Sequence, residues 1–402
     1  MALSDSQIAD LGRVTQALEQ AACKPHLRAN PDFFRTDTMF NEIEELLRES
    51  PGLKAKVIAS KIGKEKGDVN KFLYAHASDF VKDDKHQWYL KPAELRITLP
   101  EKQWLNARLF ENALMQYDSP LASPRTTVVF VFSKGCKLLL DAMARLLSLC
   151  NQLAHRGKSV EIDFHDTSST LDYFDRVGFF GLLAPSVIVS PSRPLDSKAE
   201  RYYAGNDGVV EVAAIDPRSP DQEIPRRLQS SFKKVAARRH WTDAFTVLSE
   251  LFNNVGDHAH TPIPGFAALQ HYPNGLKPHI QAVFSDSGRG ILGSLEPVLD
   301  AKYPEVAGRI RASRLPKGVA LIQEIFRSGG ISSNDDEARG LGLKRTGELA
   351  HKFNARVSVR QDTYEVRIHY SETGEIKFSS RLNLHELLGT HICFDFFLDA
   401  GD

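Results

Sequence analysis

The chain has 402 residues, of which 42% are apolar and 25% charged, close to an average globular protein. Lys plus Arg and Asp plus Glu both number 51, so the overall charge indicates no anionic partner, and any nucleic-acid surface has to be local. No stretch approaches the roughly 18 continuous apolar residues of a membrane span, and we expect no membrane association. At roughly 100–200 residues per domain, two to four domains are expected.

Four cysteines lie far apart and lack the paired spacing of a metal site, which is typical of buried or free thiols in a reducing compartment. They are Cys23, Cys136, Cys150 and Cys393. The first residues, MALSDSQIADLGRV, have no basic start followed by an apolar run, so we expect no secretory signal. The expected location is the cytoplasm.

Residues 1–95 are predicted to be mainly helical, with a small domain at about 38–91. Phe40, Ile43 and Leu47 follow helical spacing, and SPG stops that helix. A second short helix carries Ile58, and a third begins near Asp68. FVKDDKHQWYL then gives two extended runs around a polar turn, as in a hairpin.

Three short helices and a hairpin resemble a winged helix-turn-helix, in which the third helix usually enters the major groove of DNA. From Pro51 to Lys91 the chain has nine Lys and five acidic residues, a local excess of about four positive charges. DNA is therefore one expected partner. A small interaction module that touches no nucleic acid is the alternative.

Residues 96–124 are predicted to connect this region to a small α/β domain at 125–215. ELRITLP is predicted as a strand and 101–117 as a helix. In the α/β domain, TTVVFVF, SVEIDF and SVIVS are predicted strands. They alternate with a helix that ends on Gly157 and a further helix that follows HDTSST.

The α/β pattern resembles the STAS-type domains of bacterial regulators, in which a loop serine after a strand can be phosphorylated. Ser168 and Ser169 stand at roughly that place. The alternative is that DTSST simply caps the following helix.

Residues 225–402 form the last predicted domain, and its helix ELFNNVGDHAHT gathers polar groups on one stripe. At about 100° per residue, Glu250 and Asn254 lie one above the other, with Asp257 and His258 nearby. Taken alone, such a stripe is more typical of a solvated helix face than of a binding site. The opposite face is apolar, with Leu248, Leu251, Phe252, Val255 and Ala259.

Three further segments follow in order. HIQAVFSDSGRGIL is a strand that runs into Asp286, Gly288 and Gly290, where glycines allow a tight turn and close approach to a ligand. RGLGLKRTGELAHKF opens a helix with the glycine-rich run 340–343, whose free N–H groups suit a phosphate. LLGTHICFDFFL places Thr390 just before a terminal strand. Singly, each segment also fits an ordinary turn or helix start.

Together these four motifs resemble the GHKL superfamily, which includes gyrase B, Hsp-class chaperones, mismatch-repair ATPases, histidine kinases and anti-sigma-factor kinases. The resemblance covers the C-terminal two-fifths of the chain and is closest to the anti-sigma kinases. It implies an α/β sandwich that binds ATP and Mg²⁺. The whole chain is then an α+β or α/β multidomain protein.

The resemblance also implies roles for individual residues. Asn254 would bind Mg²⁺, and Glu250 would act as the general base that orients the attacking water. Asp286 would accept a hydrogen bond from the adenine amino group, with Thr390 supporting it. His258 is similar to a histidine of the anti-sigma kinases, but a purely structural role is an open alternative.

The glycine motifs would shape the two ends of the ATP site. Gly288 and Gly290 would form the adenine pocket. The residues expected to hold the phosphates are Gly340, Leu341, Gly342 and Leu343. SGGISSNDDEA has the composition of a mobile lid. The sequence leaves open which of three cations would neutralise the phosphates: Lys317, Arg327 or Arg339.

The expected function is a Mg-dependent, ATP-hydrolysing regulatory protein that couples nucleotide state to DNA or protein binding. The alternative is an anti-sigma-type Ser/Thr kinase acting on a STAS-like domain. A binding module with a vestigial ATP site is a third hypothesis. No segment resembles the phosphoacceptor helices of sensor kinases. The partner and the oligomeric state are left open, with a homodimer among the alternatives.

Overall fold

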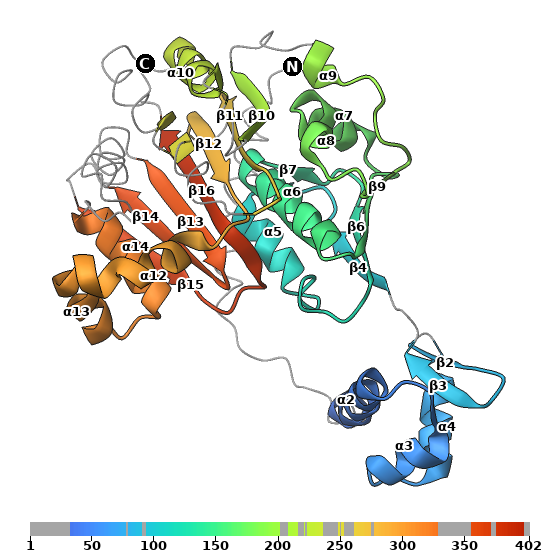
Figure 1. Cartoon of the computed structure of the whole chain (residues 1–402). Coiled ribbons are helices and arrows are strands. Elements are labelled where there is room, and N and C mark those ends of the chain that lie inside the picture. The colour runs from blue at the N-terminus through green and yellow to red at the C-terminus, as the bar shows by residue number, and fades with distance from the viewer. Residues whose placement is uncertain are drawn as a thin grey trace, which may run out of the picture. The chain divides into compact units, whose positions relative to one another are not determined.

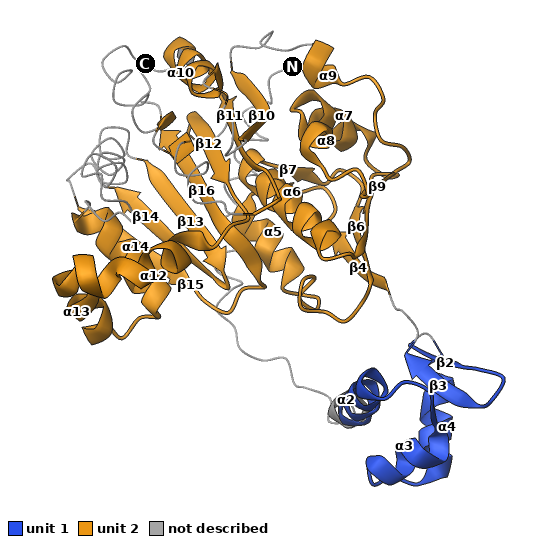
Figure 2. Ribbon diagram, in the orientation of Figure 1, with its two compact units in different colours: residues 1–93 blue, residues 94–402 orange. Residues whose placement is uncertain are grey.

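The computed structural model describes residues 33–77, 79–90, 94–201, 208–215, 221, 223–235, 248–249, 251–252, 261–274, 277–328, 355–370 and 375–397. The chain divides into two compact units, residues 1–93 and residues 94–402 (Figure 2). None of the described helices has the length and apolar character needed to cross a membrane.

The first unit contains the predicted helices and hairpin in the predicted order. Its strands pair as β1-β3-β2, and the antiparallel β2–β3 pair is the hairpin of FVKDDKHQWYL. Apolar side chains of the helices and the hairpin, among them Ile43, Ile58 and Trp88, form one core. The elements are α2 (Phe33–Glu49), β1 (Leu53–Lys54), α3 (Ala55–Lys61), α4 (Lys66–Ala75), β2 (Phe80–Lys82) and β3 (Gln87–Leu90).

The second unit begins with a parallel sheet of strand order β4-β6-β8-β9. Helices in the connections between its strands cover it, as strand–helix alternation requires. The strands are β4 (Glu94–Leu99), β6 (Thr127–Phe132), β8 (Ser159–Asp163) and β9 (Ile188–Ser190), with a separate short parallel pair, β5 (Trp104–Leu105) and β7 (Lys137–Leu138). The helices are α5 (Ala107–Leu114), α6 (Leu140–His155), α7 (Ser168–Arg176), α8 (Phe179–Leu182) and α9 (Lys198–Arg201).

A large antiparallel sheet of order β10-β11-β12-β16-β13-β14-β15 completes this unit (Figure 1). The protein is therefore a mixed α/β protein with one parallel and one large antiparallel sheet. The strands are β10 (Val209–Ile215), β11 (Gly265–Tyr272), β12 (His279–Ser285), β13 (Arg356–Asp362), β14 (Tyr364–Tyr370), β15 (Ile376–Arg381) and β16 (Leu387–Phe397). The helices are α10 (Glu223–Val235), α12 (Gly290–Lys302), α13 (Pro304–Ala312) and α14 (Lys317–Ser328).

The structure adds detail at two places where the sequence placed domain boundaries. The predicted connecting segment 96–124 supplies most of β4 and all of α5, which belong to the parallel-sheet layer. Helix α5 is shorter than the predicted helix 101–117, because Trp104 and Leu105 pair with β7 and Asn106 caps the helix through the Leu109 N–H (3.0 Å). Strand β10, at the end of predicted domain 125–215, pairs with β11 in the antiparallel sheet.

The two faces of the antiparallel sheet differ because successive side chains point to opposite sides. We call the side that packs against α10, α12 and α14 the helix face, and the other side the α6 face. Ile280 and Phe284 of β12 belong to the core of the helix face. Gln281 and Ser285 alternate with them and bond to residues of α6.

Helix α6 lies between the two sheets, contacting β8 of the parallel sheet and β11, β12 and β16 of the antiparallel sheet. Nearly the whole helix is buried, and its apolar residues join the core of the parallel layer. A second stripe is polar, with residues four, three and four positions apart, and it meets the α6 face. Its residues are Asp141, Arg145, Ser148 and Gln152.

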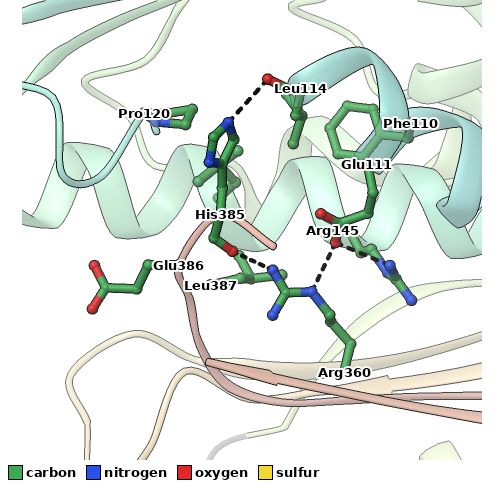
Figure 3. A pocket seen from close by; sticks show the side chains of 10 residues that line it. Phe110, Glu111, Leu114, Pro120, Arg145, Arg360, His385, Glu386 and Leu387 are labelled. Atoms are coloured by element: carbon green, nitrogen blue, oxygen red, sulfur yellow. Dashed lines mark hydrogen bonds and ion pairs between the residues drawn. The ribbon is translucent and has the colours of Figure 1, made fainter. Parts of the chain in front are cut away.

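Five buried or half-buried charges alternate in sign between α5, α6 and the sheet. Glu111 accepts hydrogen bonds from Arg145 (3.0 Å) and from Arg360 (2.9 Å), and Figure 3 shows both arginines pointing at its carboxylate. Arg145 also bonds to Glu365 (2.5 Å), which accepts from Arg367 (2.7 Å) as well. Each buried carboxylate therefore touches two cations, the condition under which burying such groups is tolerated.

The charges set the pH dependence of this contact. Burial raises the pKa of Glu365, but Arg145 and Arg367 outweigh that effect and lower it from 4.5 to about 2. The folded-state pKa is below the unfolded value, so the stabilisation is fully present above pH 4.5. It is lost as the pH falls through about 2.

We predict that Arg145→Met strongly lowers the free energy of unfolding, by about 3–5 kcal/mol, because Glu111 and Glu365 lose a shared cation in a buried place. Denaturant unfolding at pH 7 measures it. Arg226→Met on α10 is the matched control, since its ion pair with Glu223 is exposed and contributes little. Equal stabilities of the two variants would contradict the prediction.

Candidate functional site

The predicted residue Asp286 stands directly after β12, at the end of the helix face. Its N–H donates to the Thr390 carbonyl of β16 (3.0 Å), and its carboxylate accepts the Gly288 N–H (2.8 Å). Only 6% of the residue is exposed. The DSGRG turn and the GT pair, about 100 positions apart in the sequence, thus meet at one buried carboxyl group.

Two glycines allow this close approach. Gly389 has φ +90°, and a Cβ there would lie 2.0 Å from the carbonyl oxygen of Asp286. Gly290 has φ +71°, and a Cβ there would lie 3.0 Å from Nε2 of Gln361. Both values lie in the left-handed region that favours glycine. No other residue fits at Gly389 without displacing the loop that carries Asp286.

Thr390 joins Asp286 to a buried chain of polar side chains. Its hydroxyl is hydrogen-bonded to the Asp286 carboxyl and accepts from Nε2 of Gln361 (2.8 Å). The Gln361 side-chain oxygen accepts from the Tyr364 hydroxyl (3.0 Å), which packs against Gly318 of α14. The chain therefore runs from Asp286 across the helix face to α14.

Gln361 and Tyr364 were not among the residues predicted from the sequence. They lie in a stretch of strand-like alternation and belong to no motif, and only strand pairing brings Gln361 opposite Thr390. The available signal was weak: Gln361 is two and four residues after Val359 and Val357, so on a regular strand it shares their core-facing side.

Burial controls the protonation of Asp286. It raises the pKa from 3.8 to about 6, although the Gly288 N–H and the Thr390 groups oppose the shift. The protonated site is therefore the more stable one, and its stabilisation is lost as the pH rises through about 6. Near neutral pH the group is an under-solvated carboxylate, a strong acceptor for a ligand N–H.

Helix α6 supports the turn after β12 and the first residues of β16 from the α6 face. Gln152 donates from Nε2 to the Ser287 hydroxyl (2.9 Å) and the Leu388 carbonyl (2.9 Å), and its oxygen accepts the Leu388 N–H (2.9 Å). Burial, with the nearby arginines, lowers the pKa of His391 to about 3. The neutral imidazole donates from Nε2 to Leu388 and accepts from Ser285 at Nδ1.

Several predicted site residues lie outside the described part of the chain. They are Glu250, Asn254, His258, Arg339, Gly340, Leu341, Gly342 and Leu343. Of the apolar face predicted beside Glu250, Leu248, Leu251 and Phe252 are described, and all three are buried in the core of the helix face. That part of the prediction is confirmed.

Two of the three candidate phosphate cations are described, both on α14. Lys317 pairs with the exposed Glu296 of α12 (2.6 Å). Arg327, at the other end of the helix, lies over the Phe378 ring of β15, 4.7 Å from its centre. Neither contact brings the cation to Asp286.

The described residues hold no group of three or more His, Cys, Asp or Glu side chains suited to a metal ion. Cys136, Cys150 and Cys393 are buried free thiols, as expected, and burial raises the pKa of each. They show no sign of nucleophilic activation.

Comparisons of the chain with protein-family models, with curated proteins and with solved structures gave no significant match. The chemistry of the site therefore has to be inferred from its own residues: a buried carboxylate, a hydroxyl, an amide and two tightly packed glycines.

We predict that Gly389→Ala destabilises the protein by more than about 3 kcal/mol, because the added methyl overlaps the Asp286 backbone and strains φ. Thermal and denaturant unfolding measure the change. Gly308→Ala in α13 is the control: its Cβ meets nothing within 4 Å, and we expect it to be neutral or stabilising by up to about 1 kcal/mol. A neutral Gly389→Ala would refute the packing argument.

Proposed function

We propose that the second unit binds ATP with Mg²⁺ at the site around Asp286 and belongs to a GHKL-type regulatory ATPase. One observation carries the proposal. Two segments joined in the resemblance only by motif order, the DSGRG turn and the GT pair, meet at the buried carboxylate of Asp286, with Gly290 and Gly389 packed where a side chain would clash.

The described residues fit the adenine end of ATP. The Asp286 carboxylate accepts the amino N–H of the base, and the Thr390 hydroxyl, held by Gln361, sits beside it. Because the carboxylate is desolvated, a ligand N–H gains more there than in water, and a base without that donor leaves the charge unsatisfied. This end of the site sets specificity for adenine.

The phosphate end rests on the sequence resemblance. Asn254 would hold the metal, and Gly340, Leu341, Gly342 and Leu343 would supply backbone N–H groups to the phosphates. When bound, Mg²⁺ neutralises phosphate charge. Glu250 would take a proton from the attacking water and orient it.

The proposed output is regulation of DNA or protein binding by the first unit. Helix α4 exposes Lys66, Lys71 and Tyr74 beside an otherwise buried core, a surface suited to phosphate contact and stacking. The α6 contacts with Ser287 and Leu388 give the second unit a route by which changes at the nucleotide site reach the parallel-sheet layer.

A second candidate function is a serine kinase. Ser168 and Ser169 begin α7 directly after the β8 loop, and both are exposed. The N-cap position of α7 falls on Thr167, whose hydroxyl donates to the Thr170 hydroxyl (2.7 Å) and accepts no backbone N–H of the described helix. Neither serine therefore occupies the N-cap position, and both are accessible to a phosphate donor.

We predict that ATP affinity falls about tenfold per pH unit below pH 6, because only the carboxylate form of Asp286 accepts the adenine N–H. Titration calorimetry between pH 5 and 8 measures this. Asp286→Asn should weaken ATP binding by about 10- to 100-fold. It should also remove the preference for ATP over inosine triphosphate, which lacks the amino group. An unchanged preference in the variant would exclude this base contact.

We predict that the full chain hydrolyses ATP, that Glu250→Ala abolishes turnover while ATP still binds, and that Asn254→Ala weakens the Mg²⁺-dependent part of binding. Phosphate release with and without duplex DNA measures turnover and coupling together. ATP hydrolysis that persists in Glu250→Ala would refute the role assigned to Glu250. A hydrolysis rate that is the same with and without DNA would count against coupling to DNA. If labelled phosphate instead stays on the protein and disappears in Ser168→Ala/Ser169→Ala, the kinase is favoured.

A further inference from the structure

A hollow of about 600 Å³ opens on the α6 face of the antiparallel sheet, opposite the candidate nucleotide site. Its floor is formed by strands β12 to β16, and the first residues of α5 and α6 form one wall. The size is that of a pocket for a small organic molecule. We call it the α6-face groove.

Basic side chains gather at the end of the groove formed by β13, β14 and β15. Arg356 of β13 lies opposite His369 of β14, which lies opposite Lys377 of β15. Arg367 lies two residues from His369 on the same face. Opposite Cβ atoms are about 5 Å apart and successive ones on a strand about 7 Å, so all four side chains can reach one phosphate group.

Two of these cations are held in place by the protein. Arg367 donates from Nε to Glu365 (2.7 Å), and within the described part of the chain its two terminal nitrogens have no acceptor. The Arg356 guanidinium lies over the Phe397 ring, 5.0 Å from its centre. Ordered cations lose little entropy when they bind an anion. Burial, with Arg356 and Lys377 nearby, lowers the pKa of His369, consistent with a positive field.

The other end of the groove presents acceptors. Gln281 donates to Oδ1 of Asp395 (2.8 Å) and accepts the Asp141 N–H (2.9 Å), while the Asp141 carboxylate accepts the N–H groups of Ala107 and Ala142. Among the described residues nothing donates to Oδ2 of Asp395. Arg356 stands opposite Asp395 in the register, yet the two form no ion pair in this part of the structure.

Burial raises the pKa of Asp395 and of Asp141, the latter to about 6. The hydrogen bonds that the protein donates to these two carboxylates therefore do not fully replace the hydration that they lose on burial. An N–H group of a bound molecule would supply that missing partner.

We propose that the α6-face groove is a second ligand site, which takes a small organic phosphate with the phosphate on Arg356, Arg367 and Lys377 and an N–H donor group at Asp395. A nucleoside monophosphate has this chemistry: a phosphate at one end and, in guanine, adjacent N–H donors at the other. The groove does not depend on the proposed ATP site, which lies on the helix face.

Titration calorimetry of the full chain with GMP, ribose 5-phosphate and guanosine tests the site. Wild-type protein should bind GMP at least about tenfold more tightly than either fragment, because each fragment lacks one end of the contact. Arg356→Gln/Lys377→Gln should weaken GMP about tenfold or more. The matched control, Arg309→Gln/Arg311→Gln, removes two exposed cations of α13 and should leave GMP binding unchanged.

Asp395→Asn keeps the shape and the oxygen that accepts from Gln281, and it should erase the advantage of GMP over ribose 5-phosphate. The absence of GMP binding, or equal loss in the groove and control variants, would overturn the proposal. So would binding that is lost in Asp286→Asn and kept in Arg356→Gln/Lys377→Gln, since the ligand would then occupy the helix-face site. A GMP advantage that persists in Asp395→Asn would overturn the acceptor end.

Discussion

The polar stripe of α6 against the antiparallel sheet is the contact on which the second unit depends. Arg145 joins two buried carboxylates, Glu111 and Glu365, and Gln152 bonds to Ser287 just after β12 and to Leu388 at the start of β16. Charged and polar groups in a buried interface are stable only when each finds its partner, so this contact admits one register between helix and sheet. The parallel layer and the antiparallel sheet are consequently one body.

That constraint also explains the shape of the candidate nucleotide site. The Asp286 loop touches the backbone at Gly389 on one side and is tied to α6 through Ser287 on the other. These contacts thus hold the Asp286 carboxylate in a position where little water reaches it. Such a position has a cost in stability and a use in recognition, which is the usual balance at a binding site.

The same strands serve both faces of the sheet. On β13, Gln361 supports the helix-face site while Arg356 lines the α6-face groove; on β16, Thr390 and Asp395 divide in the same way. The alternation of a strand places these pairs on opposite sides, only a few residues apart. A ligand bound on either face would therefore contact β13 and β16, which also contribute residues to the site on the other face.

The amino-acid sequence was enough to predict the local elements and part of the site. Helical spacing with Gly157 at its end defined α6, an apolar run into DSGRG defined β12 and located Asp286 and Gly290, and the segment LLGTHICFDFFL located Thr390. It did not reveal Gln361, Tyr364, the Arg145 network or the groove. Periodicity tells which residues of one element share a face, because the geometry of helix and strand is local. Which faces of separate elements meet depends on packing, and the tertiary structure alone shows that Arg145 bonds to Glu365, 220 positions away, and Gln361 to Thr390, 29 positions away.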